Sequence, residues 1–228
     1  MERVLKLITL EIKKRNFLKM ATISLLALSP ILLLYSKFMD KNLIPQAALR
    51  LIAFIILVIS SFSLTHEFSN KTDKIIFTGI FSRTQIMISK LVSFIFVTTI
   101  CFIFYEIVLI VCGTFDFKNL FGNFLTFNIY VFTIGSFILL VSVITSNFIV
   151  TGITCYILYF DLILVLFNNA LGSNRSEEIK QIIRNLPFYI ANMGFAKGMY
   201  TVTESIVMLG YGIVFFALAC VIMNRKNI

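Results

Sequence analysis

The chain has 228 residues, of which 59% are hydrophobic, and its mean hydropathy is +0.95. A soluble domain of this length needs a polar surface that such a composition cannot supply, so a soluble globular protein is excluded. The 20 Lys and Arg residues outnumber the 11 Asp and Glu residues, which gives a net charge of +9. In a membrane protein, basic residues indicate which connections are cytoplasmic, so this excess is not evidence for nucleic-acid binding.

Residues 1–17 are predicted to form a helix that lies on the membrane surface. Its apolar residues fall on one arc at helical spacing and its basic residues on the other, as expected of an interfacial helix. The apolar arc contains Met1, Val4, Leu5, Ile8 and Ile12, and the basic arc contains Arg3, Lys6, Lys13 and Lys14. The alternative is a positively charged start that only sets the topology. The segment lacks the continuous apolar run of a cleavable signal peptide.

Six apolar runs predict six transmembrane helices, because about 20 apolar residues cross a hydrocarbon core of roughly 30 Å. The predicted spans are about 18–38, 48–64, 88–113, 124–145, 148–167 and 205–223. An even number of spans puts both termini on one side of the membrane. If that side is the cytoplasm, twelve of the 20 Lys and Arg residues are cytoplasmic, so the positive-inside rule favours this orientation. The prediction is an all-α polytopic membrane protein with a single domain over residues 1–228.

Two connections between the spans have sequence features that predict their local structure. Only Ser146 and Asn147 separate the fourth and fifth spans, which predicts a tight turn. The external segment 168–204 is predicted to contain short helices before the last span. One of them starts after Ser176, a suitable N-cap, and ends at Pro187.

The sequence contains no recognised motif for binding a metal or a phosphate. Cys101, Cys112, Cys155 and Cys220 lie in or beside apolar runs without CxxC spacing, which predicts buried thiols rather than disulfides or a metal site. The single histidine, His66, has no second histidine four residues on, which excludes a zinc peptidase of that pattern. No GxxxxGK[ST] phosphate loop occurs, so the chain itself is not expected to bind ATP or to be an enzyme.

Two carboxylates fall inside predicted spans. Glu106 and Asp161 are placed about 24 Å and 21 Å from the cytoplasmic ends of their helices at ~1.5 Å per residue. A carboxylate in lipid costs ~2.5–3.5 kcal/mol on insertion scales, so both are expected to face the protein interior or a wet cavity. They could line an outward-facing substrate path that favours cationic groups. Alternatively, they could hydrogen-bond neighbouring spans, for instance Tyr105 or Tyr156, for assembly only.

The stretch DKIIFTGIFSR, residues 73–83, lies between the second and third spans. Its apolar residues Ile75, Ile76 and Phe77 are too few to cross a bilayer and are bordered by charges. A short amphipathic helix of this kind suits docking into a groove on a soluble partner. The alternative is an ordinary amphipathic cytoplasmic loop.

The residues around this stretch resemble a family motif, that of the ABC-transporter type-2 permeases. In that family an acidic residue ends the second span, and a Gly-Thr pair, an apolar helix, Pro-x-Ser-Arg and a Lys seven residues later follow it. The matching residues here are Glu67, Thr72, Ser82, Arg83 and Lys90.

Two positions depart from the family pattern, because Lys71 replaces the usual Gly and Ile80 the usual Pro. The chain therefore resembles a divergent member. The basic start, the six spans, the tight turn between spans four and five and the external helices resemble the family layout over essentially the whole chain.

The resemblance implies a permease subunit in a bacterial cell membrane that pairs with a second permease, either an identical or a sister chain. Cytosolic ATPase subunits would bind it and would carry the ATP and Mg. Residues 71–83 would be the coupling helix that contacts the ATPase. The residues assigned to this contact are Asp73, Lys74, Ile75, Ile76, Phe77, Ile80 and Arg83.

The chain is also similar to short permeases that export amphipathic or antimicrobial peptides from Gram-positive bacteria. This similarity implies a peptide substrate drawn from the cell or the bilayer. Export of other hydrophobic compounds or drugs is the nearest alternative. An ion-coupled carrier that uses Glu106 and Asp161, or a purely structural membrane scaffold, would be a protein of a different class.

Overall fold

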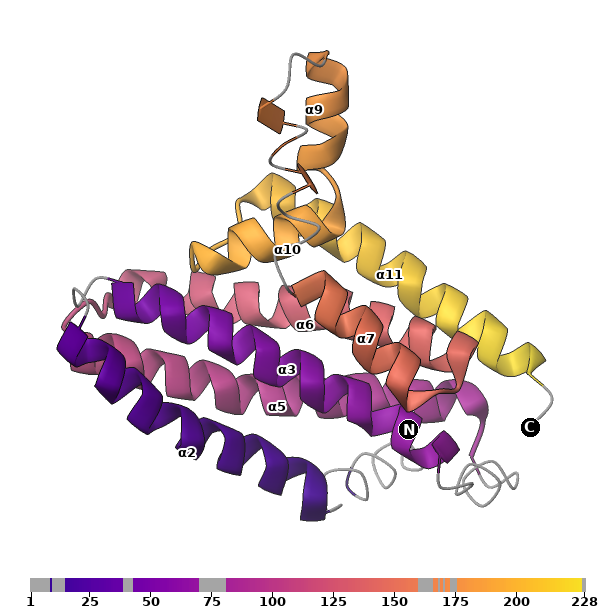
Figure 1. Cartoon of the computed structure of the whole chain (residues 1–228). Helices are drawn as coiled ribbons and strands as arrows, with labels where there is room; N and C mark the ends of the chain where they lie inside the picture. The colour runs from indigo at the N-terminus through magenta and orange to yellow at the C-terminus, as the bar shows by residue number, and fades with distance from the viewer. Residues whose placement is uncertain are drawn as a thin grey trace.

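The computed structural model describes residues 9, 15–38, 43–69, 81–159, 166–167, 169, 171–172 and 176–226. Within these ranges every regular element is a helix, which confirms the all-α prediction for them (Figure 1). The long helices are α2 (Arg15–Phe38), α3 (Ile44–Ser69), α5 (Arg83–Cys112), α6 (Leu120–Thr145) and α11 (Val202–Arg225). The short ones are η2 (Phe117–Asn119), α7 (Phe148–Tyr159), α9 (Glu177–Arg184) and α10 (Pro187–Ala196).

Among the described residues, four segments are long and apolar enough to cross a membrane. They are Ile44–Ser61, Arg83–Cys112, Phe117–Thr145 and Val202–Arg225. The shortest has 18 residues, which extend over ~27 Å at ~1.5 Å per residue and so approach the thickness of a hydrocarbon core. The chain is therefore a membrane-embedded, all-α protein.

The other two predicted spans correspond to shorter apolar helices in the described residues. The apolar part of α2 covers Lys19–Leu32. Helix α7 has 12 residues, or about 18 Å of helix, and the predicted continuation to residue 167 passes through 160–165, outside the described residues. The six-span layout therefore stays a prediction, as does the interfacial helix at 1–17, of which only Thr9 and the start of α2 are described.

Five helices start earlier than the predicted spans. They start at Arg15, Ile44, Arg83, Leu120 and Val202, whereas the spans were placed at residues 18, 48, 88, 124 and 205. Hydropathy marks where a helix enters the apolar core, but the helix itself continues through a further polar or basic turn. The third span is predicted to end at Gly113; α5 ends one residue earlier, at Cys112, and Gly113 caps it in the left-handed conformation with φ 72°.

We call the two ends of the bundle the Ser146 end and the Gly113 end. The Ser146 end contains the start of α5, the α6–α7 turn and the end of α11. The Gly113 end contains the α5–α6 turn and the start of α11. Figure 1 shows α3, α5 and α6 running along the bundle between these ends, α2 flanking them, and α9 projecting away from it.

Helix α6 is the central helix of the bundle and packs against α3, α5, α7, α10 and α11. Its sequence is apolar on all faces, as expected of a helix surrounded by others. It nevertheless buries several polar side chains, among them Thr133, whose hydroxyl donates to the Met208 carbonyl of α11 at 2.8 Å. Such a bond ties two helices together where no water competes for the groups.

The predicted turn between α6 and α7 is confirmed. Ser146 adopts the left-handed conformation with φ 49° and its N–H donates to the Ser142 carbonyl at 2.9 Å. The Asn147 side chain then accepts a hydrogen bond from the Ile149 N–H at 2.8 Å, at the start of α7. Asn commonly caps a helix in this way because its side-chain oxygen replaces a missing intrahelical acceptor.

Helix α9 starts directly after Ser176, where the sequence predicts a short helix before the last span. Ser176 occupies the N-cap position, but its side chain makes no capping hydrogen bond. Pro187 is the first residue of α10, so it both prevents continuation of α9 and starts the next helix.

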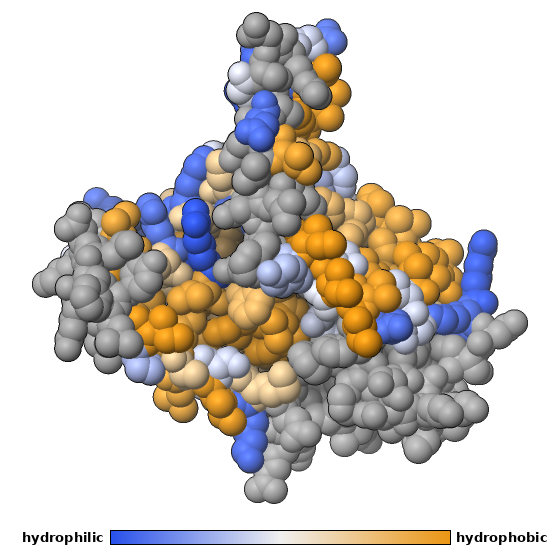
Figure 2. Space-filling model, viewed as in Figure 1, coloured by the Kyte–Doolittle hydropathy of each residue, from blue (hydrophilic) through white to orange (hydrophobic). Residues whose placement is uncertain are grey.

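The apolar surface of the described residues follows the long helices. Figure 2 shows hydrophobic residues over α7 and α11, with hydrophilic residues gathered near the extremities of the molecule. Exposed apolar side chains on α11 include Ile206 and Ile213, at 65% and 62% exposure. This distribution fits a bundle surrounded by lipid, because lipid tails are as apolar as these side chains.

Helices α6 and α11 approach closely at Gly212. A Cβ atom at this position would lie 2.6 Å from ring atoms of Phe132 and 3.2 Å from the Cα atom of Thr133. Two residues earlier on the same helix, a Cβ atom at Gly210 would meet nothing within 4 Å. The contact between these helices therefore requires a glycine at 212 and not at 210.

We predict that Gly212→Ala lowers the thermal stability of the purified protein, because overpacking costs about 1–3 kcal/mol. Gly210→Ala is the matched control and should be neutral or stabilising by up to ~1 kcal/mol, since Ala is the better helix former. Thermal unfolding in detergent, followed by circular dichroism, measures both. Equal midpoints for the two variants would contradict the close approach of α6 and α11.

Candidate functional site

The start of α5 is fixed by a capping box. The Ser82 hydroxyl accepts from the Gln85 N–H at 3.2 Å, and the Gln85 side-chain oxygen accepts from the Ser82 N–H at 3.0 Å. The two bonds satisfy backbone donors that have no partner within the helix. The helix consequently begins at Arg83, which places the Arg83 side chain at the Ser146 end of the bundle.

The Arg83 guanidinium binds the last turn of α11. Its Nη1 atom donates to the carbonyls of Met223 at 2.8 Å and Asn224 at 3.3 Å, and also to that of Lys226. These carbonyls lie at or just beyond a helix C-terminus, where intrahelical partners are missing and the helix dipole favours a cation. A second, longer bond joins the same elements, from the Asn224 amide to the Thr84 hydroxyl at 3.4 Å.

Lys226 extends this contact from α11 to the α6–α7 turn. Its ammonium donates to the Val143 carbonyl at 2.5 Å and to the Ser146 hydroxyl. Val143 is in the last turn of α6, so its carbonyl also lacks an intrahelical donor. Burial lowers the pKa of Lys226. We refer to Ser82, Arg83, Ser146, Asn224 and Lys226 as the Arg83 cluster.

The motif residues predicted from sequence are only partly described. Ser82 and Arg83 belong to the Arg83 cluster, and Arg83 is the first residue of α5 rather than part of a separate coupling helix. Lys90 is two helical turns further along α5, is only 1% exposed, and lies near the same face as Arg83 at ~100° per residue. The residues that lie outside the described ranges are Thr72, Asp73, Lys74, Ile75, Ile76, Phe77 and Ile80. Glu67 is in α3, but its side chain lies outside the part of the chain that the structure describes.

Of the two carboxylates predicted inside spans, Glu106 is described and Asp161 lies outside the described residues. Glu106 is 7% exposed, which confirms that it faces the protein interior. Its Oε1 atom accepts from the Asn123 amide of α6 at 3.0 Å, and Asn123 is 6% exposed. Its Oε2 atom is buried without a hydrogen-bond partner.

The partner of Glu106 differs from the residue suggested by its sequence neighbourhood. Tyr105 does not bond the carboxylate; its ring packs against that of Phe127, with centroids 5.6 Å apart. Asn123 was not among the predicted site residues because it falls just before the predicted start of the fourth span, where polar residues are common. A polar residue on the next helix, just beyond the α5–α6 turn, could have suggested this partner. Hydropathy does not show which helices pack against each other, so it did not identify Asn123.

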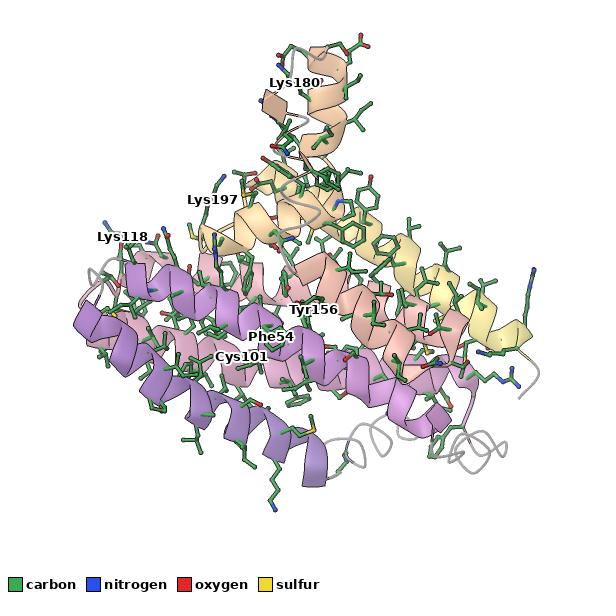
Figure 3. The ribbon with its side chains drawn as sticks, in the orientation of Figure 1. Phe54, Cys101, Lys118, Tyr156, Lys180 and Lys197 are labelled. Carbon is green, nitrogen blue, oxygen red and sulfur yellow. The ribbon has the colours of Figure 1, made fainter. Side chains whose placement is uncertain are left out.

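The Gly113 end is covered by the connection between α10 and α11. The Tyr200 N–H donates to the Thr126 hydroxyl at 3.1 Å, and its own hydroxyl donates to the Ala191 carbonyl at 3.5 Å. Burial raises the pKa of the Tyr200 hydroxyl well above its usual range, so it remains a neutral donor. Lys118 and Lys197 are exposed near the same end and point away from the bundle in Figure 3.

The described residues contain no group of three or more His, Cys, Asp or Glu side chains that could hold a metal ion. Cys101, Cys112 and Cys220 are free thiols.

No protein-family model matches the chain, and no curated protein matches it significantly. The features of the chain that bear on function are therefore the sequence motif and two polar sites, the Arg83 cluster and the Glu106–Asn123 pair.

We predict that Arg83→Ala loosens the last turn of α11. Loss of the charged donor should cost about 1 kcal/mol of local stability, equivalent to roughly fivefold faster opening. Hydrogen exchange of the Lys226 amide, which donates to the Ile222 carbonyl at 3.1 Å, measures this directly. Arg83→Lys should give an intermediate rate, because one ammonium replaces the guanidinium fork.

Arg184→Ala is the control, since Arg184 is an exposed arginine in the last turn of α9. It should leave exchange in α11 unchanged. If Arg83→Ala also leaves that exchange unchanged, the contact between Arg83 and α11 contributes nothing to stability.

Proposed function

We propose that the chain is the permease subunit of an ATP-driven ABC exporter, with six spans and both termini in the cytoplasm. The Ser146 end then faces the cytosol, and residues 71–82 contact a cytosolic ATPase. The observation that best supports this proposal is the Arg83 cluster, because it joins the residues directly after the coupling segment to α11 and to the α6–α7 turn.

The cluster provides a mechanical connection suited to this function. A displacement of the coupling segment would move Ser82, which caps α5, and would therefore move the start of α5. Arg83 would carry the end of α11 with it through the three carbonyls that it binds. Lys226 would pass the movement on to the turn between α6 and α7. Several helices would thus respond as one unit rather than separately.

The division of roles between the subunits follows from the resemblance to the permease family. Ile75, Ile76 and Phe77 would enter an apolar groove on the ATPase, with Asp73 and Lys74 at its polar rim. ATP and Mg would be bound by that subunit. A second permease, either identical or a sister chain, would complete the transporter.

The proposed substrate is an amphipathic or antimicrobial peptide taken from the cell or the membrane. The short helices α9 and α10 lie between α7 and α11, and so short a connection suits a substrate that enters from the bilayer. Other hydrophobic compounds or drugs are the second candidate within the same class. An ion-coupled carrier is favoured by a different observation, the buried carboxyl group of Glu106.

We predict that Phe77→Asp abolishes co-purification of the ATPase and transport-linked ATP hydrolysis, because a charge in an apolar groove costs several kcal/mol. Membrane insertion should be unaffected. Phe117→Asp is the control, since Phe117 is 77% exposed at the Gly113 end, away from the proposed contact. Retention of a stimulated ATPase by the Phe77 variant would show that this segment is not the contact.

Purification of the chain from its native host in mild detergent tests the assembly itself. An ATPase recovered in comparable amount, identified by mass spectrometry, is the expected result. A second permease in the sample would establish a pair of different chains. Recovery of the chain alone, together with transport that survives ATP depletion, would favour the ion-coupled carrier.

A further inference from the structure

The carboxyl group of Glu106 is held differently at its two oxygens. Oε1 accepts a hydrogen bond from the Asn123 amide at 3.0 Å, so the orientation of the group is fixed between α5 and α6. Oε2 is buried and has no hydrogen-bond partner. The side chain lies six residues before the end of α5 at Cys112, or ~9 Å along the helix, and is followed by apolar residues.

A carboxylate in this position would leave a negative charge on a buried oxygen with no donor. Burial of an unpaired ionised group costs far more than burial of a neutral polar group, and such groups usually take up a proton instead. The neutral acid still accepts the Asn123 bond at its carbonyl oxygen while the other oxygen carries hydrogen. The arrangement of donors around Glu106 therefore matches the acid form and does not match the carboxylate.

Among the described residues, no charged group donates a hydrogen bond to either carboxyl oxygen of Glu106. Helix α6, which supplies Asn123, contains no Asp, Glu, Lys, Arg or His along its whole length. Among described side chains near the Gly113 end, Arg50 of α3 is exposed, and Glu204 of α11 accepts hydrogen bonds from Thr201. The adjacent Tyr105 is 4% exposed, and its ring packs against that of Phe127.

The burial of Oε2 also limits the size of any ligand. Its surface is closed to a molecule as small as water, so a metal ion or an ammonium group could not bind it in this conformation. A proton needs no additional space.

We infer that Glu106 is a proton-binding site, with the proton on Oε2 while α5 and α6 are packed as described. The proton would leave to water only when the contact between α5 and α6 opens. Release of the proton would then leave a hydrated carboxylate, and uptake would accompany closure. This inference does not rest on the exporter function, because it follows from the surroundings of one side chain.

Infrared spectroscopy of the full chain in a detergent without ester groups tests the inference. Exposed carboxyl groups have pKa values near 4, so they are ionised at neutral pH and lack the C=O stretch of a protonated acid. We expect the wild-type protein to show this band at neutral pH, shifted in D2O, and Glu106→Gln to lose it. Asp116→Asn is the matched control, because Asp116 is exposed and accepts from the Lys118 N–H at 3.0 Å; this variant should keep the band.

The wild-type spectrum alone can overturn the inference, whatever the variants do. Absence of a protonated-acid band at neutral pH would show that Glu106 is ionised. A band of undiminished intensity in a folded Glu106→Gln variant would assign it to another residue and would also overturn the inference. Neither result bears on whether an ATPase co-purifies with the chain, so the two proposals fail separately.

Discussion

The satisfaction of backbone carbonyls at helix ends is the constraint on which the described bundle depends. A membrane offers few hydrogen-bond donors, so groups left free by the end of a helix must find partners within the protein. At the Ser146 end, Arg83 and Lys226 supply donors to the ends of α11 and α6. Because each of these donors comes from a different helix than its acceptor, the same bonds that satisfy the carbonyls also set how the helices meet.

The interior of the bundle follows the same principle on a smaller scale. Helix α6 lies at the centre and carries hydroxyl and amide side chains at positions that face other helices. Thr133 bonds α11 and Asn123 bonds α5. Between these polar contacts the packing is apolar and close, as at Gly212, where two helices meet without room for a methyl group. Polar bonds and small residues together position helices that lipid alone would not order.

The two polar sites lie at opposite ends of the bundle and suit different roles. The Arg83 cluster is charged, half-buried and connected to three helices, which suits the transfer of movement from a cytosolic partner. The Glu106–Asn123 pair is uncharged in the form we infer and nearly closed to water, which suits storage of a proton. Since α5 contributes to both sites, a shift of its first turn and a change at Glu106 would act on one continuous helix of 30 residues.

The sequence by itself determined the membrane class, the approximate helix positions, the Ser146–Asn147 turn and the burial of Glu106. These properties depend on consecutive residues or on the general cost of charge in lipid, so they can be derived without knowing which helices meet. Only the tertiary structure decided that Arg83 binds carbonyls 140 and more residues away, that Asn123 rather than Tyr105 bonds Glu106, and that Gly212 must be small while Gly210 need not be. The reason is that hydropathy and helical spacing describe one helix at a time, whereas a bonding partner is chosen by the packing of one helix against another.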